Sequence, residues 1–156
     1  MAERRRHTSG ASVVGFPLDV PHLADTSAWS KARNHDALAA LFDDAARGGL
    51  IATCDLVALE LLRSARNHQR FERQNELLTN LPACPLGTAQ LARAREVQAS
   101  LAASGHHRGV KPADLLIAAA GEAAGLPILH YDHDYDLIAS VTKQPIRWLS
   151  ARGSLP

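Results

Sequence analysis

The chain has 156 residues, of which 46% are hydrophobic, so it can form one folded domain with a sizeable core. Its 17 Lys and Arg residues against 16 Asp and Glu residues give a formal net charge of +1, which excludes a strong overall field for binding nucleic acids or membranes. Two cysteines, Cys54 and Cys84, are too few for the disulfide framework of a small secreted protein and have no metal-binding spacing, so we expect a reducing cytoplasm.

The N-terminal segment is basic but does not lead into a signal peptide or a membrane span. The stretch "VVGFPLDVP" is interrupted by glycine, aspartate and two prolines, which exclude a continuous apolar core. We therefore interpret residues 1–20 as a loose N-terminal extension. The folded domain is expected at 21–150, followed by a C-terminal tail at 151–156.

Beyond residue 20, short apolar runs alternate with longer helical patterns, an order typical of a parallel sheet with helices on its faces. The first run, 20–24, is predicted to be a strand that ends at Asp25. Residues 25–49 then form a helical region that two consecutive glycines close. A second short strand is predicted at 50–53.

The middle of the chain is mainly helical. Helices are predicted at 55–65 and 68–81, and a weak strand follows at 82–86 between turn-forming residues. Residues 88–104 give a clear helical pattern, with Thr88 as the expected N-cap.

The last third of the sequence returns to alternating elements. After a loop at 105–109, Pro112 is well placed to begin a helix over 112–125, because the first helical residue needs no backbone N–H. The chain shows no internal repeat. The elements predicted after this helix are a strand at 126–131, a helix at 134–142 and a strand at 145–149.

Four acidic residues occur where a carboxylate is unexpected. Asp25 and Asp132 each follow a predicted strand, so they converge on one crevice if those strands are neighbours. Glu60 interrupts "LVALELL" and Asp114 opens "LLIAAA", surroundings in which a carboxylate is costly unless a positive group compensates it. Clustered carboxylates fit a hard divalent cation such as Mg²⁺ or Mn²⁺. Taken singly, each acid has a structural alternative. Asp25 could be a helix cap, Asp114 a favourable charge at a helix N-terminus, and Glu60 a residue on a solvated edge.

The heptapeptide "HYDHDYD" concentrates acids and histidines at the end of a predicted strand. We expect Asp132 to contact the metal, Asp134 to assist through water, and Asp136 to face solvent or cap the next helix. A zinc site that uses His130 and His133 is the alternative interpretation. No closed set of histidines and cysteines accompanies them, and the other acids favour a hard ion.

The segments "ADTSAW", "ALELL", "PADLLIAAAG" and "ILHYDHDYDLIA" resemble, in order and spacing, the acidic motifs of PIN-domain nucleases, and most closely the VapC toxins of bacterial toxin–antitoxin pairs. The resemblance covers about residues 20–150. It implies a three-layer α/β/α fold with a short, mainly parallel sheet, and a Mg²⁺- or Mn²⁺-dependent endoribonuclease that leaves a 5′-phosphate and a 3′-hydroxyl. Carried over position by position, the resemblance implies that the acidic quartet is Asp25, Glu60, Asp114 and Asp132. It also implies Asp134 as a candidate fifth metal ligand and Ser27 as a polar support.

The same resemblance implies the partners. These are a VapB-type antitoxin and a transfer or ribosomal RNA substrate. The implied assembly is a homodimer or a toxin–antitoxin hetero-oligomer, and no membrane partner is expected. The predicted helices around 56–65 and 71–81 offer more apolar surface than a small sheet needs, so we expect partners to bind there. In relatives the position of His130 is often Thr or Ser, which leaves its role open.

We infer hydrolysis of a phosphodiester by a metal-activated water, because no Ser-His-Asp or Cys-His arrangement is apparent. An acidic centre repels a polyanion, so basic residues are needed around it. Arg63, Arg66, Arg70 and Arg73 share one face if the helix continues past Asn67, and this face could bind RNA or simply be solvated. The other rim candidates are Arg108 and Lys111.

Two other classes of function compete with this prediction. A small-molecule phosphohydrolase would use an aspartyl nucleophile, but "DTSAW" lacks the second aspartate that such enzymes place two residues later. A PIN-like module that has lost its metal would only bind a partner, but all four acids are present. A nuclease assay with and without EDTA separates the three.

Overall fold

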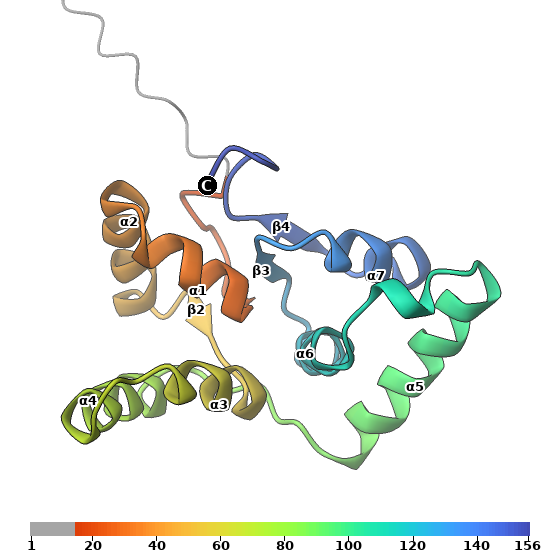
Figure 1. Cartoon of the computed structure of the whole chain (residues 1–156), viewed down its shortest axis with the longest axis horizontal. Coiled ribbons are helices and arrows are strands. Elements are labelled where there is room, and N and C mark those ends of the chain that lie inside the picture. The colour runs from red at the N-terminus through yellow and green to blue at the C-terminus, as the bar shows by residue number, and fades with distance from the viewer. Residues whose placement is uncertain (1–14) are drawn as a thin grey trace, which may run out of the picture.

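A short parallel sheet forms the centre of the fold in the computed structural model, which describes residues 15–156. The strand order is β2-β1-β3-β4, and every neighbouring pair is parallel (Figure 1). The parallel sheet predicted from the sequence is therefore confirmed. Its strands are β1 (His22–Ala24), β2 (Ile51–Ala52), β3 (Ile128–His130) and β4 (Ile146–Trp148).

The two central strands are buried on both faces, which explains why they read as short unbroken apolar runs. All three residues of β1 and of β3 are buried. Leu23 pairs with Ala52 on one side and with Ile128 on the other. Because β1 and β3 are parallel neighbours, the residues that follow them meet at one edge of the sheet.

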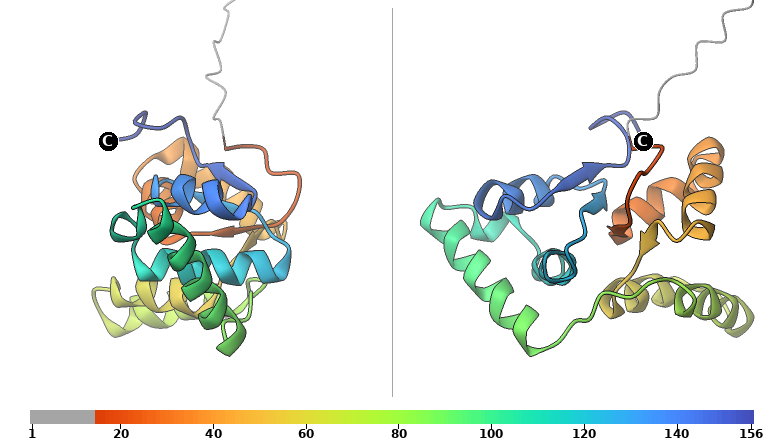
Figure 2. Two further views of the ribbon diagram at one scale, coloured as in Figure 1. Left: turned by 90° about the vertical axis from the view of Figure 1, so that its right-hand side faces the viewer. Right: turned by 180° about the vertical axis from the view of Figure 1, so that it is seen from behind.

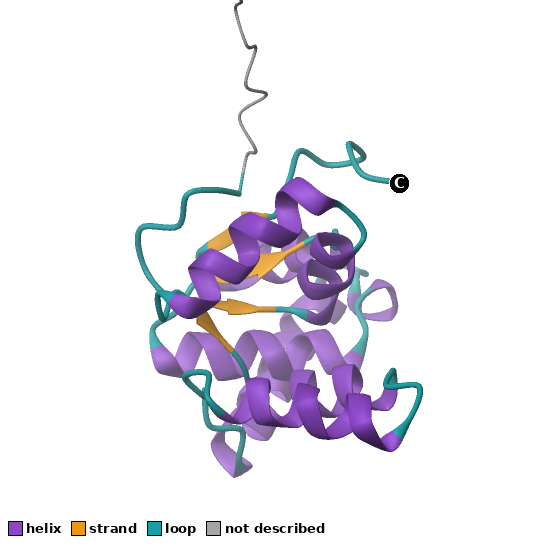
Figure 3. Cartoon of the chain, turned by 90° about the vertical axis from the view of Figure 1, so that its left-hand side faces the viewer, coloured by secondary structure: helices purple, strands orange, loops and turns teal. Residues whose placement is uncertain are grey.

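Helices surround the sheet and make up most of the described chain, as Figure 3 shows. They are α1 (Thr26–Arg33), α2 (Asp36–Arg47), α3 (Asp55–Arg63), α4 (His68–Thr79), α5 (Thr88–Ala103), α6 (Pro112–Ala124) and α7 (Asp134–Thr142). Helices α1 and α2 lie on one side of the sheet, and α6 and α7 lie on the other with α5 packed outside them (Figures 1 and 2). Helices α3 and α4 pack together beyond β2. The result is the predicted α/β/α architecture.

One predicted strand is absent from the sheet. The segment 82–86 contributes only a single parallel bridge, between Thr53 and Ala83. Pro82 and Pro85 have no N–H to donate, so the pairing cannot extend into a ladder.

The helix ends follow local capping signals. Helix α5 is capped by Gly87 rather than by the expected Thr88, and the backbone N–H of Gly87 donates to Gln90 Oε1 at 2.8 Å. The helical region predicted at 25–49 is two helices, because the backbone becomes extended at His35. The other predicted helices are confirmed, and α6 begins at its proline as expected.

Residues 1–14 of the expected N-terminal extension lie outside the described residues. The next six residues contact the fold: Gly15 N donates to Leu149 O at 3.1 Å, and Leu18 is buried. A Cβ atom on Gly15 would overlap the backbone of Leu149, so this approach requires glycine.

The core lies where the helices meet the sheet. Leu23, Ile51 and Ile128 from the strands are fully buried, together with Leu101 of α5 and Ile117 of α6. Within residues 15–156, no helix has the length and apolar character needed to cross a membrane.

Candidate active site

The four acids singled out from the sequence line one cleft of about 570 Å³. Asp25 directly follows β1 and Asp132 comes two residues after β3, so the neighbouring strands bring these two together. Glu60 reaches the cleft from α3, and Asp114 from the first turn of α6. Four distant parts of the chain therefore converge at the carboxyl edge of the sheet.

Asp25 is buried and held by donors on both of its oxygens. Ser27 donates from its N and its Oγ to Asp25 Oδ2, at 3.0 and 2.5 Å. Tyr135 OH donates to Asp25 Oδ1 at 2.8 Å. Ser27 Oγ also accepts from the backbone N–H of Tyr131 at 2.9 Å, which ties α1 to the end of β3. Asp25 is thus the N-cap of α1 as well as a site carboxylate.

Glu60 is oriented by a residue that the sequence did not single out. Thr26 Oγ1 donates to Glu60 Oε2 in a short hydrogen bond. Glu60 is half-buried and lines the cleft, so it does not lie on a solvated edge. The signal for Thr26 was its position beside Asp25 in "DTS".

Asp114 has a buried oxygen without a hydrogen-bond donor. The residue is 4% exposed, and no group in residues 15–156 donates to Oδ2. Lys111 Nζ lies 3.2 Å away, within ion-pair distance but outside hydrogen-bond geometry. Burial, and then the carboxyl groups of Asp134 and Asp25, raise the pKa of Asp114 to about 8. A divalent cation would satisfy this oxygen and favour its ionised form.

Lys111 lies among the acids rather than on the rim where it was expected. Its Nζ donates to Asp132 Oδ2 at 2.8 Å and to Asp134 Oδ2 at 2.9 Å. Its backbone N–H donates to the same oxygen of Asp134 at 3.1 Å. Burial alone would lower the pKa of Lys111, but these hydrogen bonds raise it well above its usual value. The lysine therefore stays protonated and neutralises part of the cluster.

Asp134 is buried at the start of α7. Burial acts to raise the pKa of Asp134, but hydrogen bonds with Lys111 and Asp114 outweigh it and hold the pKa below its usual value. Its backbone N–H donates to Asp132 Oδ1 at 3.0 Å. One potential ligand atom from each of Asp132, His133 and Asp134 lies within 4.8 Å of the other two. Within the described residues, these three therefore form a compact group that could hold a metal ion.

The histidines do not form a zinc site together. His130 is fully buried between Tyr135 and Trp148, and its Nδ1 accepts from Asp132 N at 3.2 Å. Burial lowers the pKa of His130, so the ring is neutral. Asp136, expected at the solvent or as a cap, instead accepts a hydrogen bond from Trp148 Nε1 at 3.0 Å.

The single arginine face depended on a helix that continues past Asn67, and the structure does not meet this condition. Helix α3 ends at Arg63, and Asn67 caps α4 by accepting from the backbone N–H of Arg70 at 2.9 Å. Arg63 lines the acidic cleft. The other three arginines of the set line a neighbouring groove instead. Arg108 lies outside both, in a 3-10 turn at His107–Gly109.

Comparison with known proteins gives consistent matches. The family model for the PIN domain matches residues 23–141. Ribonuclease VapC18 of Mycobacterium tuberculosis is 42% identical over 137 residues, which cover 84% of this chain and 96% of the relative. Ribonuclease VapC51 of the same organism is 39% identical over 138 residues, which cover 88% and 99%.

Solved structures agree on the fold. VapBC2 from Rickettsia felis, bound to a DNA fragment from their promoter, superposes with a TM-score of 0.64 at 15% identity, over 83% of this chain and 98% of that chain. DNA-bound VapBC from Salmonella typhimurium gives a TM-score of 0.63 at 16% identity over the same shares, 83% and 98%.

Proposed function

The chain belongs to the PIN-domain family, among the VapC ribonucleases, and we propose that it is the toxin of a type II toxin–antitoxin pair. Its activity is that of an endoribonuclease, which hydrolyses RNA phosphodiester bonds with a divalent cation. The observation that carries the proposal is the convergence of Asp25, Glu60, Asp114 and Asp132 on one cleft.

The donor set fits Mg²⁺ or Mn²⁺. The cleft offers carboxylate oxygens, the ligands that hard cations prefer, and one of them, Asp114 Oδ2, is buried without a donor. Asp25, Asp114 and Asp132 would hold the cation, with Glu60 and Asp134 in support. When bound, the cation would lower the pKa of a water molecule and offset charge on the phosphate.

Residues of the chain prepare this site by orienting two of its carboxylates. Ser27 and Tyr135 fix the carboxylate of Asp25, and Thr26 fixes Glu60, in the manner of outer residues that orient metal ligands. No histidine or cysteine among the described residues lines the cleft, so it offers no Ser-His or Cys-His pair for covalent catalysis. Water is therefore the attacking group.

Asparagine substitutions test the assignment. Asp25→Asn and Asp114→Asn should each lower RNA cleavage in Mg²⁺ or Mn²⁺ by more than about 100-fold, since residues that merely orient metal ligands already contribute 10- to 100-fold. Asp44→Asn is the matched control, because Asp44 is exposed on α2 and pairs only with Arg47. EDTA should abolish cleavage by the unaltered chain. Full cleavage by a folded double variant, or in EDTA, would exclude the mechanism.

We also propose a VapB-type antitoxin as the partner, in a cytoplasm that keeps the two buried cysteines as free thiols. Three large apolar side chains of α3 and α4 are exposed, namely Leu59 at 65%, Phe71 at 38% and Leu77 at 46%. A partner helix could cover them. The purified chain should form a complex with the product of a small adjoining gene and lose its ribonuclease activity. Mass measurement of the isolated chain tests the expected homodimer.

A further inference from the structure

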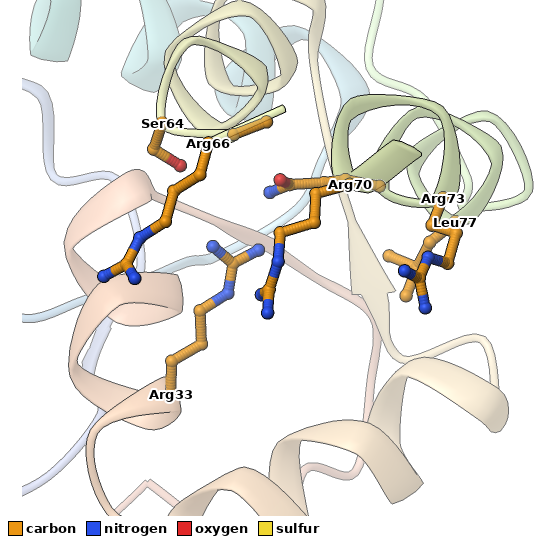
Figure 4. A pocket seen from close by; sticks show the side chains of 8 residues that line it. Arg33, Ser64, Arg66, Arg70, Arg73 and Leu77 are labelled. Carbon is orange, nitrogen blue, oxygen red and sulfur yellow. The ribbon is translucent and has the colours of Figure 1, made fainter. Parts of the chain in front are cut away.

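A second groove of about 490 Å³ lies beside the acidic cleft and is lined by arginines. Arg33 enters it from the end of α1. Arg66 comes from the turn between α3 and α4, and Arg70 and Arg73 come from α4. Figure 4 shows the Arg33 side chain reaching across towards Arg66 and Arg70, so positive charge is presented from facing walls.

These arginines form no ion pair with the described part of the chain, although the charge of Asp43 acts on Arg33 from a greater distance. None of the four lies within 4.0 Å of a carboxylate in residues 15–156. Arg33 is held over the ring of Trp29, with its Cζ 5.8 Å from the centroid. Gln74 also lines the groove, and its buried Nε2 has no acceptor. A cluster of unpaired donors of like charge is the arrangement that a polyanion stabilises.

The groove continues into the acidic cleft at one end. Ser64 lines both hollows, and Arg63, directly before it, lines the cleft. At the other end, the adjacent hollow is lined by Asp43 and Glu76 together with Arg47 and Arg73, so acidic and basic side chains are mixed there. An extended anion would therefore be attracted most strongly between Arg73 and Arg63, where the lining residues that carry charge are arginines.

We propose that Arg33, Arg66, Arg70 and Arg73 bind consecutive phosphates of single-stranded RNA next to the bond that is cleaved, and that Arg63 leads the strand into the cleft. The proposal deepens the proposed function and rests on it. No aromatic residue of the described chain lines the groove, so bases do not stack on aromatic rings there and contacts from the arginines to phosphates dominate. Because Arg33 points towards Arg66 and Arg70 across the groove, a single strand that lies between them can contact arginines on both sides.

The test is binding of fluorescent oligoadenylate and oligouridylate to the full chain, with EDTA present so that no cleavage occurs. The double change Arg66→Ala and Arg70→Ala should weaken binding of both oligonucleotides about tenfold. It should also flatten the dependence of log affinity on log salt by about 1.4, since single strands contribute about 0.7 for each phosphate neutralised. Arg66→Lys with Arg70→Lys should keep most of that salt dependence.

The matched control is Arg95→Ala with Arg152→Ala, which removes the same charge from exposed residues outside the groove. Equal losses in both double variants, or a wild-type chain that binds an acidic partner protein but no RNA, would overturn the proposal. If the groove variants bind RNA normally and EDTA-sensitive cleavage persists, the proposed role of the groove is wrong but the nuclease assignment is retained. If RNA binds through the groove but is never cleaved, the nuclease assignment is wrong but the proposed role of the groove in RNA binding is retained. Thermal unfolding confirms that each variant folds.

Discussion

Asp25 and Asp114 occupy the same cleft but are stabilised differently. Asp25 receives hydrogen bonds from Ser27 and Tyr135, so its charge is compensated within the chain. Asp114 has an oxygen without a donor and a raised pKa. The carboxylate of Asp25 is therefore already oriented to bind a cation, whereas the carboxylate of Asp114 would be stabilised most when a cation binds.

The acids could be predicted because each left a local signal. A carboxylate inside an apolar run, such as Glu60 or Asp114, stands out in one sequence. The hydrogen bond from Tyr135 to Asp25 could not be predicted, because it depends on how α7 docks across β1. Lys111 was noticed as basic, but its place among the acids follows from the approach of α6 to α7.

Lys111→Met should strengthen the binding of Mn²⁺. The lysine ammonium lies within hydrogen-bond distance of Asp132 and Asp134, so a cation at these oxygens has to displace or repel it. Removing one positive charge at this range should tighten Mn²⁺ binding by about three- to tenfold, measured by calorimetry. Lys31→Met, a change on α1 away from these acids, is the control. Equal or weaker Mn²⁺ binding by the Lys111 variant would contradict this role.

At the scale of elements, short polar signals decide where the arginines lie. In the sequence, Asn67 indicates a break between two helices, but a break alone does not give the direction of the second helix. Asn67 caps α4, and the new helix direction separates Arg63 from Arg70 and Arg73. Arg33 joins the latter two from α1, more than 30 residues earlier in the chain. Spacing within one segment cannot predict such a meeting.

Strand β1 begins with a buried histidine that should make the fold sensitive to acid. Burial lowers the pKa of His22 from 6.5; the hydrogen bond to Val20 and the charge of Asp19 act in the opposite direction, and the charge of Arg147 adds to the lowering. His22 Nδ1 donates to Val20 O at 2.7 Å, which a neutral ring can do. As pH falls below 6.5, the unfolded chain takes up this proton before the folded chain does. The free energy of unfolding should therefore fall from pH 6.5 downward.

His22→Asn keeps a side-chain donor and removes the titration. Urea unfolding at pH 7.5 and pH 5 should show that the variant loses less stability on acidification than the unaltered chain. His68→Asn is the control, since His68 is exposed and its change should leave the loss unaltered. A loss of the same size in the His22 variant would show that another group causes the acid sensitivity.

For the whole molecule, a net charge of +1 conceals a strong separation of charge. Carboxylates from α3, α6 and the ends of β1 and β3 gather in one cleft, and arginines from α1 and α4 gather in the groove beside it. Composition counts charges but does not place them. The sequence predicted the cleft through its motifs and three of the groove's arginines through their spacing, but it could not predict that Arg33 joins them. The two surfaces have complementary tasks in the proposed reaction, which are to bind a cation and to hold an anionic strand.

The acidic cleft should also set the stability of the whole fold. Asp114 is buried beside Asp25 and Asp134, and its pKa is raised to about 8. Without a cation, its carboxyl group has to be desolvated and take up a proton on folding near pH 7, which opposes folding. In EDTA, Asp114→Asn should therefore raise the melting temperature by a few degrees. Millimolar Mn²⁺ should raise that of the unaltered chain through preferential binding to the folded state, but should have little effect on the variant. Asp44→Asn should respond to Mn²⁺ as the unaltered chain does. If Asp114→Asn melts lower in EDTA and still gains stability from Mn²⁺, then Asp114 stabilises the fold and is not a ligand of the cation.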